Sequence, residues 1–178
     1  MLTVHPDVAG IVRPAWFVAE PVRVVEQDDA LEALRRAGTA RMRAAAEPLD
    51  TIAAVRTMYK RVGIDPTKTR PSSEALLRRV RRGDELPRIN SLVDVINWCS
   101  LETQLPYGLY DLDHIRGPVT LRLGRAGEEY EGIRKAIVHV DRPCSPNRIE
   151  QRLGRVDRFG SGDPIRSYVL TCTDATFE

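Results

Sequence analysis

The sequence predicts an α+β fold in which helices pack on a mixed or antiparallel sheet, and three observations lead to this prediction. Four helical patterns follow one another between residues 28 and 104, stretches of strand character lie on both sides of them, and the regular strand–helix alternation of a parallel sheet is missing. Of the 178 residues, 42% are hydrophobic and 29% are charged. These values are typical of a globular domain that is large enough to bury a core.

The N-terminal part begins with a strand pattern and continues with two helices. Residues 13–25 are rich in valine and alternate in polarity around Trp16, which indicates one or two strands. Residues 28–47 open with acidic residues and continue in alanine, leucine and arginine, the pattern of an amphipathic helix. A second helix is predicted over 51–62, where Gly63 follows as a natural left-handed terminal residue.

Two more helices and two strands are predicted in the middle of the chain. Pro71 precedes a short, arginine-rich helix over 72–82, and Gly83 ends it. A longer helix is predicted over 90–104. The residues of this helix that are expected to face the core are Leu92, Val93, Ile96 and Leu101. The strands that follow are predicted at 107–111 and 118–123.

The last part of the chain has a different pattern and is predicted to be a separate unit. Strand patterns at 136–141 and 165–172 enclose a short helical pattern over 145–160. We therefore divide the chain into a first domain over 1–135 and a tail over 136–178. The strands of the tail are expected to add to the sheet of the first domain.

Positive charge is concentrated in one segment. Residues 56–88 contain ten basic and four acidic residues, a local excess of +6 in a chain whose net charge is +2. Such an excess favours a polyanionic partner, and no zinc-finger or recognition-helix pattern is present, so the expected partner is RNA. The alternative is a solvated basic face on a helix whose other face is buried. The candidate RNA-binding residues are Lys68, Arg70, Arg78, Arg79, Arg81, Arg82 and Arg88.

The composition disfavours several other classes of site. Cys99, Cys144 and Cys172 are widely spaced and form no C-x-x-C pair, which disfavours a disulfide framework and a zinc site and favours a reducing cytosol. The histidines have no metal-ligand spacing, so neither a metal nor another cofactor is expected. No apolar run approaches the roughly 18 residues of a membrane span. A cytoplasmic location is therefore expected. The sequence assigns no catalytic residue.

One stretch of the first domain carries a specific resemblance. Residues 56–133, which include RTMYKRVGIDPTKTRPSSEALL, INSLVDVIN and LPYGLYDLDHIRG, closely resemble the B3/B4 domain of the phenylalanyl-tRNA synthetase β subunit. The sequence is most similar to freestanding proteins built from that domain alone, and the resemblance extends over residues 5–134. It implies an α+β fold and a tRNA-associated role. Because this domain of the synthetase hydrolyses wrongly tyrosylated tRNA, the resemblance also implies an aminoacyl-tRNA deacylase that acts in trans.

The resemblance also implies a substrate pocket. The residues that match the pocket motif and the strand beside it are Asn90, Asp94, Asn97, Tyr107, Gly108 and Tyr110. Asn90 is expected to hydrogen-bond the amino acid or ribose of the substrate, and helix capping by Asn90 is the alternative. The synthetase has a histidine where this chain has Gly108, so that part of the synthetase pocket is absent here.

The tail resembles a second family. Residues 136–178 contain the pattern Q-R-x-G-R-x-x-R and resemble the end of the second motor lobe of superfamily II helicases, which implies that Arg155 and Arg158 correspond to arginine fingers. Phosphoryl transfer also needs a phosphate-binding lysine and a metal-holding acid. Neither G-x-x-x-x-G-K-[ST] nor D-E-x-[DH] occurs, so ATPase activity is not expected. The residues of the helicase-like motif are Gln151, Arg152, Gly154, Arg155 and Arg158.

These observations predict a tRNA- or RNA-binding module of the B3/B4 type. Its C-terminal part is expected to be incomplete and replaced, by fusion, with a helicase-like strand–helix–strand tail. One alternative is a helicase-related fragment that docks a nucleotide or a partner without ATPase activity of its own. Another is a chain without activity.

Overall fold

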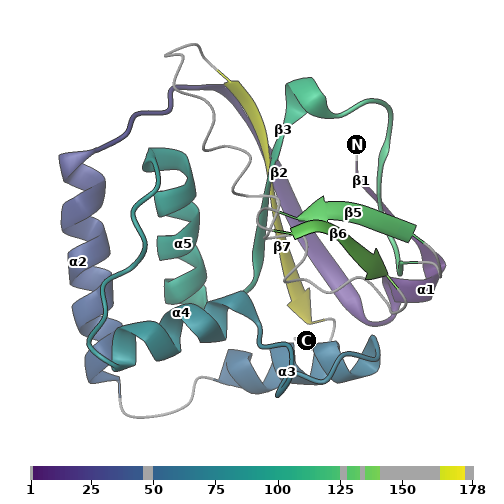
Figure 1. Ribbon diagram of the computed structural model, residues 1–178, viewed down its shortest axis with the longest axis horizontal. Coiled ribbons are helices and arrows are strands. Elements are labelled where there is room, and N and C mark those ends of the chain that lie inside the picture. Colours follow the sequence, from purple (N-terminus) through teal and green to yellow (C-terminus); the bar gives the residue numbers. More distant parts are fainter. Residues whose placement is uncertain (1, 46–49, 125–127, 133–134, 141–164, 175–178) are drawn as a thin grey trace.

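The computed structural model describes residues 2–45, 50–124, 128–132, 135–140 and 165–174 and has the predicted α+β architecture (Figure 1). The helices are α1 (Pro6–Ala9), α2 (Asp29–Ala44), α3 (Asp50–Arg61), α4 (Ser72–Arg81), α5 (Ser91–Thr103) and the short 3-10 helix η1 (Leu112–His114). The strands are β1 (Leu2–Val4), β2 (Val12–Val22), β3 (Tyr107–Asp111), β4 (Val119–Leu121), β5 (Glu128–Gly132), β6 (Lys135–Val140) and β7 (Ile165–Asp174). Of these elements, β1, α1, η1 and β5 were not predicted.

The strands form one three-stranded sheet and two strand pairs. The three-stranded sheet has the order β2-β7-β3, and β7 runs antiparallel to both neighbours. In this register Trp16 lies opposite Leu170 and Leu109 lies opposite Val169. The pair β1–β4 is parallel and the pair β5–β6 is antiparallel. The prediction that a tail strand joins the sheet of the first domain is confirmed for β7, which occupies the central position.

Local sequence signals fix the ends of the helices. The side chain of Asp28 accepts a hydrogen bond from the backbone N–H of Leu31 (2.9 Å) and so caps the N-terminus of α2. Gly63 and Gly83, which follow α3 and α4, have φ values of 78° and 96°. Because side chains other than glycine rarely adopt this left-handed conformation, the predicted glycine stops are confirmed. The helix predicted over 145–160 lies outside the described residues.

The buried apolar side chains form three clusters that join the layers. Between α5 and β3 the cluster consists of Leu92, Val93, Ile96 and Leu109. Between α3 and β2 it consists of Val12, Val55, Met58, Tyr59, Val62 and Ile64. Where α2, α4 and α5 meet it consists of Met42, Leu77, Val80, Leu86 and Leu101. All four residues of the 90–104 helix that were predicted to face the core are buried.

The third cluster determines how α2, α4 and α5 cross one another. Figure 1 shows α2 and α5 side by side, with α4 lying across their ends and the sheet on the other side of α5. This crossing brings the C-terminal ends of α2 and α4 to the same corner of the molecule. Within the ranges that the structure describes, no helix combines the length and the apolarity that crossing a membrane would require.

A glycine allows α2 and α5 to approach closely. Gly38 is buried in the middle of α2, where a Cβ atom would lie 2.7 Å from Nε1 of Trp98 and would also meet the carboxylate of Glu102. Neither neighbour can move easily, because the indole N–H of Trp98 donates to Glu102 (3.2 Å) and Arg41 forms an ion pair with the same carboxylate. A residue that ordinarily weakens a helix is therefore needed here for packing.

We expect Gly38→Ala to lower the free energy of unfolding by about 1–3 kcal/mol, the usual cost of overpacking, although alanine is the better helix former. Chemical denaturation monitored by circular dichroism would measure this change. Gly10→Ala is the matched control, because a Cβ at Gly10 meets nothing within 4 Å and its φ of −89° suits any residue. An unchanged or higher stability of Gly38→Ala would show that the contact with Trp98 is not tight.

Candidate nucleic-acid interface

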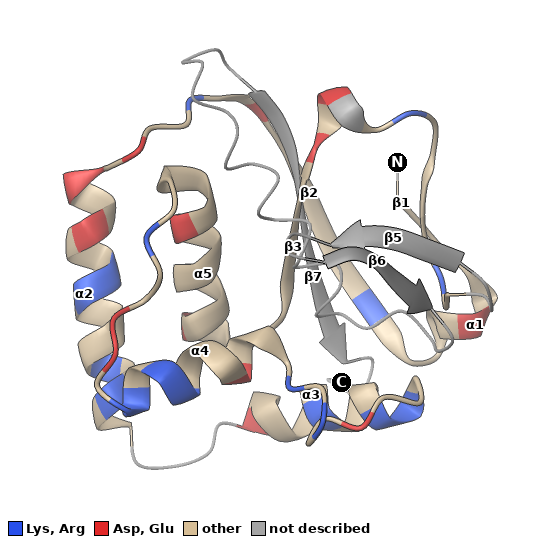
Figure 2. Cartoon of the chain, viewed as in Figure 1, with Lys and Arg blue, Asp and Glu red and all other residues tan. Residues whose placement is uncertain are grey.

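Exposed arginines from two helices gather where α2 and α4 end. Figure 2 shows this concentration of basic residues at the ends of both helices. We call it the basic corner, and its members are Arg41, Arg43, Arg78, Arg79, Arg81 and Arg82. The sequence predicted the four arginines of the α4 segment but missed Arg41 and Arg43. Their place at the C-terminal end of the predicted 28–47 helix was visible, but only the crossing of α2 and α4 brings them here.

Two of these arginines hold the C-terminal end of α4. Nε of Arg43 donates to the backbone oxygen of Val80 at 3.0 Å, and Nε of Arg79 donates to the backbone oxygen of Glu85 at 2.6 Å. The last carbonyl groups of a helix lack partners within the helix and form the negative end of its dipole, so cations are favourable there. Nη2 of Arg43 also donates to the backbone oxygens of Gly83 and Asp84, at 3.2 and 3.5 Å, so three carbonyls fix this side chain.

The remaining arginines at the end of α4 differ in their contacts. Arg81 donates to the backbone oxygen of Ala45 at 3.0 Å, which ties α4 to the end of α2. Arg82 lies 3.9 Å from the carboxylate of Asp84, and both side chains are exposed, so this contact contributes little to stability. Arg78 makes no side-chain hydrogen bond or ion pair with the rest of the described chain. The corner therefore combines anchored and free arginines.

The structure does not bring the other predicted RNA-binding residues to the basic corner. Lys68 is exposed on the loop between α3 and α4, where it lies near the carboxylate of Asp65. Arg88 forms an ion pair with Glu32 of α2 at 2.5 Å, and its side chain is 57% exposed. Arg70 is engaged near the start of α4. Their role in RNA binding stays a prediction.

Arg70 belongs to a clamp that joins α3 to the first turn of α4. Arg56 donates two hydrogen bonds to the carboxylate of Glu74, at 2.8 and 2.9 Å, and Nε of Arg70 lies 3.3 Å from the same carboxylate. The hydrogen bond from Arg56 holds the pKa of Glu74 below its ordinary value, and the charges of both arginines act in the same direction. Burial opposes this shift.

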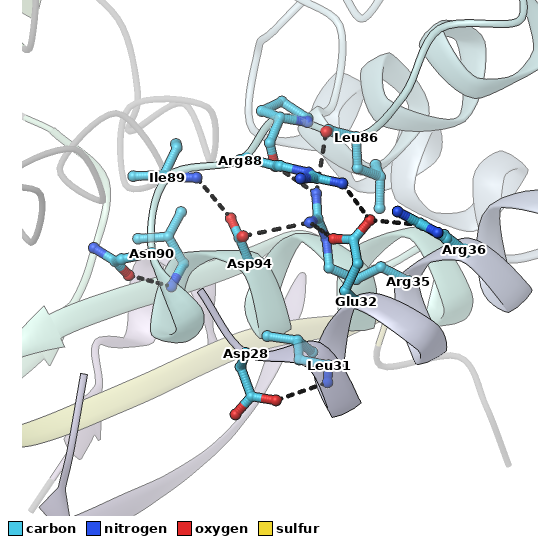
Figure 3. A network of polar contacts seen from close by, with 12 residues as sticks. Asp28, Leu31, Glu32, Arg35, Arg36, Leu86, Arg88, Ile89, Asn90 and Asp94 are labelled. Atoms are coloured by element: carbon cyan, nitrogen blue, oxygen red, sulfur yellow. Dashed lines mark hydrogen bonds and ion pairs between the residues drawn. The ribbon is translucent and has the colours of Figure 1, made fainter. Parts of the chain in front are cut away.

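The candidate pocket residues on α5 take part in holding the fold together. Oδ1 of Asn90 accepts a hydrogen bond from the backbone N–H of Val93 at 3.0 Å, so the buried Asn90 caps α5 (Figure 3). This is the capping alternative for Asn90, and it is confirmed. Oδ1 of Asp94 accepts from the backbone N–H of Ile89 at 2.9 Å, and Oδ2 lies 3.4 Å from Arg35. Burial raises the pKa of the Asp94 carboxyl, whereas the bond from Ile89 and the charge of Arg35 lower it.

Arg35 is the centre of this network and was not singled out by the sequence. Its side chain is only 5% exposed and donates to Glu32 at 2.8 Å. It also donates to the backbone oxygens of Leu86 and Pro87, at 3.0 and 2.7 Å. Figure 3 shows Arg35 between α2, the segment before α5, and Asp94. Since an arginine in an amphipathic helix is normally exposed, no sequence signal indicated this role.

The remaining pocket residues do not all face the same way. Asn97 lies on the same stripe of α5 as Asn90 and Asp94, is half-buried, and has no side-chain hydrogen bond to other described residues. Tyr107 packs against the apolar cluster between α5 and β3. Neighbouring residues of a strand point to opposite faces of the sheet. Gly108 and the half-buried Tyr110 therefore lie on the opposite face of β3 from Tyr107.

Two further predictions from the sequence concern the helicase-like motif and the lack of a metal site. The motif residues Gln151, Arg152, Gly154, Arg155 and Arg158 lie outside the described residues, so their assignment stays a prediction. Within the described part of the chain, no three histidine, cysteine or acidic side chains lie together in a way that could hold a metal ion.

Comparison with known proteins identifies a family over much of the chain. A family model described as the B3/4 domain matches residues 54–155, which is more than half of the sequence. The phenylalanine–tRNA ligase beta subunit of Xanthomonas campestris pv. campestris is 42% identical over 67 residues, which cover 38% of this chain and 8% of that protein. The beta subunit of Ralstonia nicotianae is 30% identical over 88 residues, which cover 49% of this chain and 11% of that protein. The chain thus spans about a tenth of the length of these curated relatives. No solved structure matches the chain.

The family match crosses the predicted boundary between the first domain and the tail. It ends at residue 155, whereas the sequence analysis placed the boundary after residue 135. The relatives described above are tRNA ligases, and the helicase resemblance of 136–178 is not among these findings. Both the boundary and the helicase resemblance stay predictions.

We expect Arg35→Met to lower the free energy of unfolding by about 3–5 kcal/mol, because it removes the guanidinium group from the buried carboxylate of Asp94 and from the carbonyls of Leu86 and Pro87. The matched control is Arg36→Met on the next residue, whose side chain is 69% exposed and pairs with Glu32 at 3.0 Å. This control should change stability by no more than about 1 kcal/mol. Equal effects of the two variants, measured by denaturant unfolding, would contradict the role assigned to Arg35.

The clamp at Glu74 predicts a pH dependence of stability. Because the pKa of Glu74 is lowered in the folded state, its contribution is present above its ordinary pKa of 4.5 and is lost as the pH falls through the lower folded value. Glu74→Gln should therefore be less stable than the unmodified chain at neutral pH, and the difference should shrink in acid. Denaturant unfolding over a pH series measures this stability difference. Glu85→Gln is the control, because the side chain of Glu85 is exposed. A difference that stays constant with pH would exclude the lowered pKa.

Proposed function

Because the chain belongs to the B3/4 domain family, we propose that it binds RNA, with tRNA as the natural partner, through the basic corner. The relatives it resembles are ligases that join phenylalanine to tRNA, as their name states. The chain covers only about a tenth of those proteins, so the proposal concerns the RNA-associated role of one domain and not the ligase activity.

The observation that carries this proposal is the excess of positive charge at the basic corner. Six exposed arginines lie there, and the acidic residues beside them in the described part of the chain are Asp84, Glu85 and Glu102, which leaves a local charge of +3 among these residues. Arginines that replace condensed counterions on a phosphate backbone supply most of the affinity for a nucleic acid. A basic face assembled from two helices that are distant in sequence suits this role better than a single solvated helix face does.

The geometry favours binding over hydrolysis as the function of this chain. In the candidate pocket, Asn90 is used as a helix cap and Asp94 is bound to Ile89 and Arg35, so both already have structural partners. Hydrolysis of misacylated tRNA in trans is the finer proposal that follows from the family. It would depend on residues such as Asn97 and Tyr107, which lie on or against the same helix.

Removing two arginines from the basic corner should weaken RNA binding. The double variant Arg78→Gln/Arg82→Gln is suitable, because both arginines are exposed and neither holds another element in place. We expect the affinity for tRNA to fall by roughly tenfold or more near 0.1 M salt. The slope of log affinity against log salt should fall by about one for each arginine. Fluorescence anisotropy with labelled tRNA over a salt series measures both quantities.

A charge-matched variant separates a specific surface from a general effect of charge. Arg23 and Arg116 are exposed in the segments that follow β2 and η1, outside α2 and α4, so Arg23→Gln/Arg116→Gln removes the same charge elsewhere. This control should keep the affinity within about twofold, since it removes no phosphate contact. If both double variants lose affinity equally, the basic corner is not the binding surface.

A further inference from the structure

In the part of the chain that the structure describes, the helical surface that carries the basic corner offers no aromatic side chain on which a base could stack. Residues 18–58 and 60–97, which contain α2, α3, α4 and most of α5, include no Phe, Trp or Tyr, and Tyr59 between them is fully buried. Trp98 is half-buried with its indole N–H bonded to Glu102, and its ring edge packs against Gly38. Proteins that bind single-stranded RNA rely on bases stacked on such side chains. This surface therefore lacks the main contact that a single strand would need.

The arginines of the basic corner are instead arranged as fixed phosphate contacts. Arg43, Arg79 and Arg81 are each anchored by at least one backbone carbonyl, and Arg43 by three, which restricts the motion of the guanidinium groups. Side chains that are already ordered lose less entropy when they bind a partner of fixed geometry. The phosphates of an A-form duplex are such a partner, because they lie in regular rows on both sides of the minor groove.

Acidic residues limit how far RNA can extend over the helical layer. Glu26, Asp28 and Asp29 lie at or just before the N-terminal end of α2, at the opposite end of the helix from Arg41 and Arg43 (Figure 2). A flexible strand that wrapped along α2 would meet this negative charge. A rigid stem that touches only the basic corner would not.

We infer that the RNA bound at the basic corner is a double-stranded stem, recognised through its phosphate backbone and not through its bases. This inference rests on the RNA-binding function proposed above and names the form of RNA that the same surface takes. It predicts that affinity depends on the A-form helix and is nearly independent of sequence.

The test compares a duplex with its own separated strands. An RNA duplex of about 16 base pairs, the length that double-stranded RNA-binding domains span, is titrated against each strand alone under the same salt conditions. We expect the duplex to bind about tenfold more tightly than either strand, and a second duplex of unrelated sequence to bind within about threefold of the first. Equal or tighter binding of a single strand overturns the inference and leaves RNA binding in place. Failure of every RNA to bind overturns the proposed function itself.

A charge-preserving variant tests the role of the anchored arginines. Arg79→Lys/Arg81→Lys keeps both positive charges but replaces the planar guanidinium groups that reach the carbonyls of Glu85 and Ala45. We expect its affinity for the duplex to fall by about threefold or more, because lysine side chains must be ordered on binding. Its weak affinity for single strands should stay within about twofold, since that depends on charge alone. Unchanged duplex affinity, in a variant whose unfolding curve shows an intact fold, overturns the fixed-geometry argument.

Discussion

The buried guanidinium of Arg35 joins the parts of the molecule that the candidate interface requires. It contacts Glu32 on its own helix, the carbonyls of Leu86 and Pro87 in the segment after α4, and Asp94 on α5. Removing a charge from water is costly, and it is tolerated only where several well-placed acceptors surround the charge. Among the described residues, Nε of Arg35 has no hydrogen-bond partner, so the loss of any one of the other acceptors would leave more of this buried charge uncompensated. Because α2, α5 and the exit from α4 meet at this one side chain, their crossing is fixed, and the place of the basic corner is fixed with it.

The basic corner combines a structural role with the proposed binding role. The arginines that donate to carbonyls at and after the end of α4, and that tie α4 to α2, are also exposed members of the basic corner. Stability and the proposed RNA affinity are therefore coupled at Arg43, Arg79 and Arg81, whereas Arg78 and Arg82 can be changed with less effect on the fold. The network around Arg35 has only a structural role, because its members are bound to one another and join α2 to the N-terminal part of α5.

Local signals predicted the elements well, and contacts distant in sequence account for what the sequence could not predict. The Asn90 cap, the glycine stops and the apolar face of α5 depend on neighbouring residues, so the sequence reveals them. The partners of Arg35 in the 86–87 segment lie 51 and 52 positions away, and nothing in its helical pattern indicates burial. The same holds for Gly38, whose function is visible only against α5, and for the central position of β7 between β2 and β3. The pocket prediction placed Gly108 and Tyr110 with Tyr107, and strand alternation separates them.

The most direct test of the central claim is an arginine footprint of the full chain with a duplex RNA. An arginine-specific dicarbonyl reagent is applied with and without saturating RNA, and the modified positions are quantified by mass spectrometry. The account predicts reduced modification at Arg41, Arg43, Arg78, Arg79, Arg81 and Arg82, with Arg23 and Arg116 unchanged. Protection confined to Arg13 on β2 or to the loop arginines, with the basic corner fully reactive, would contradict it.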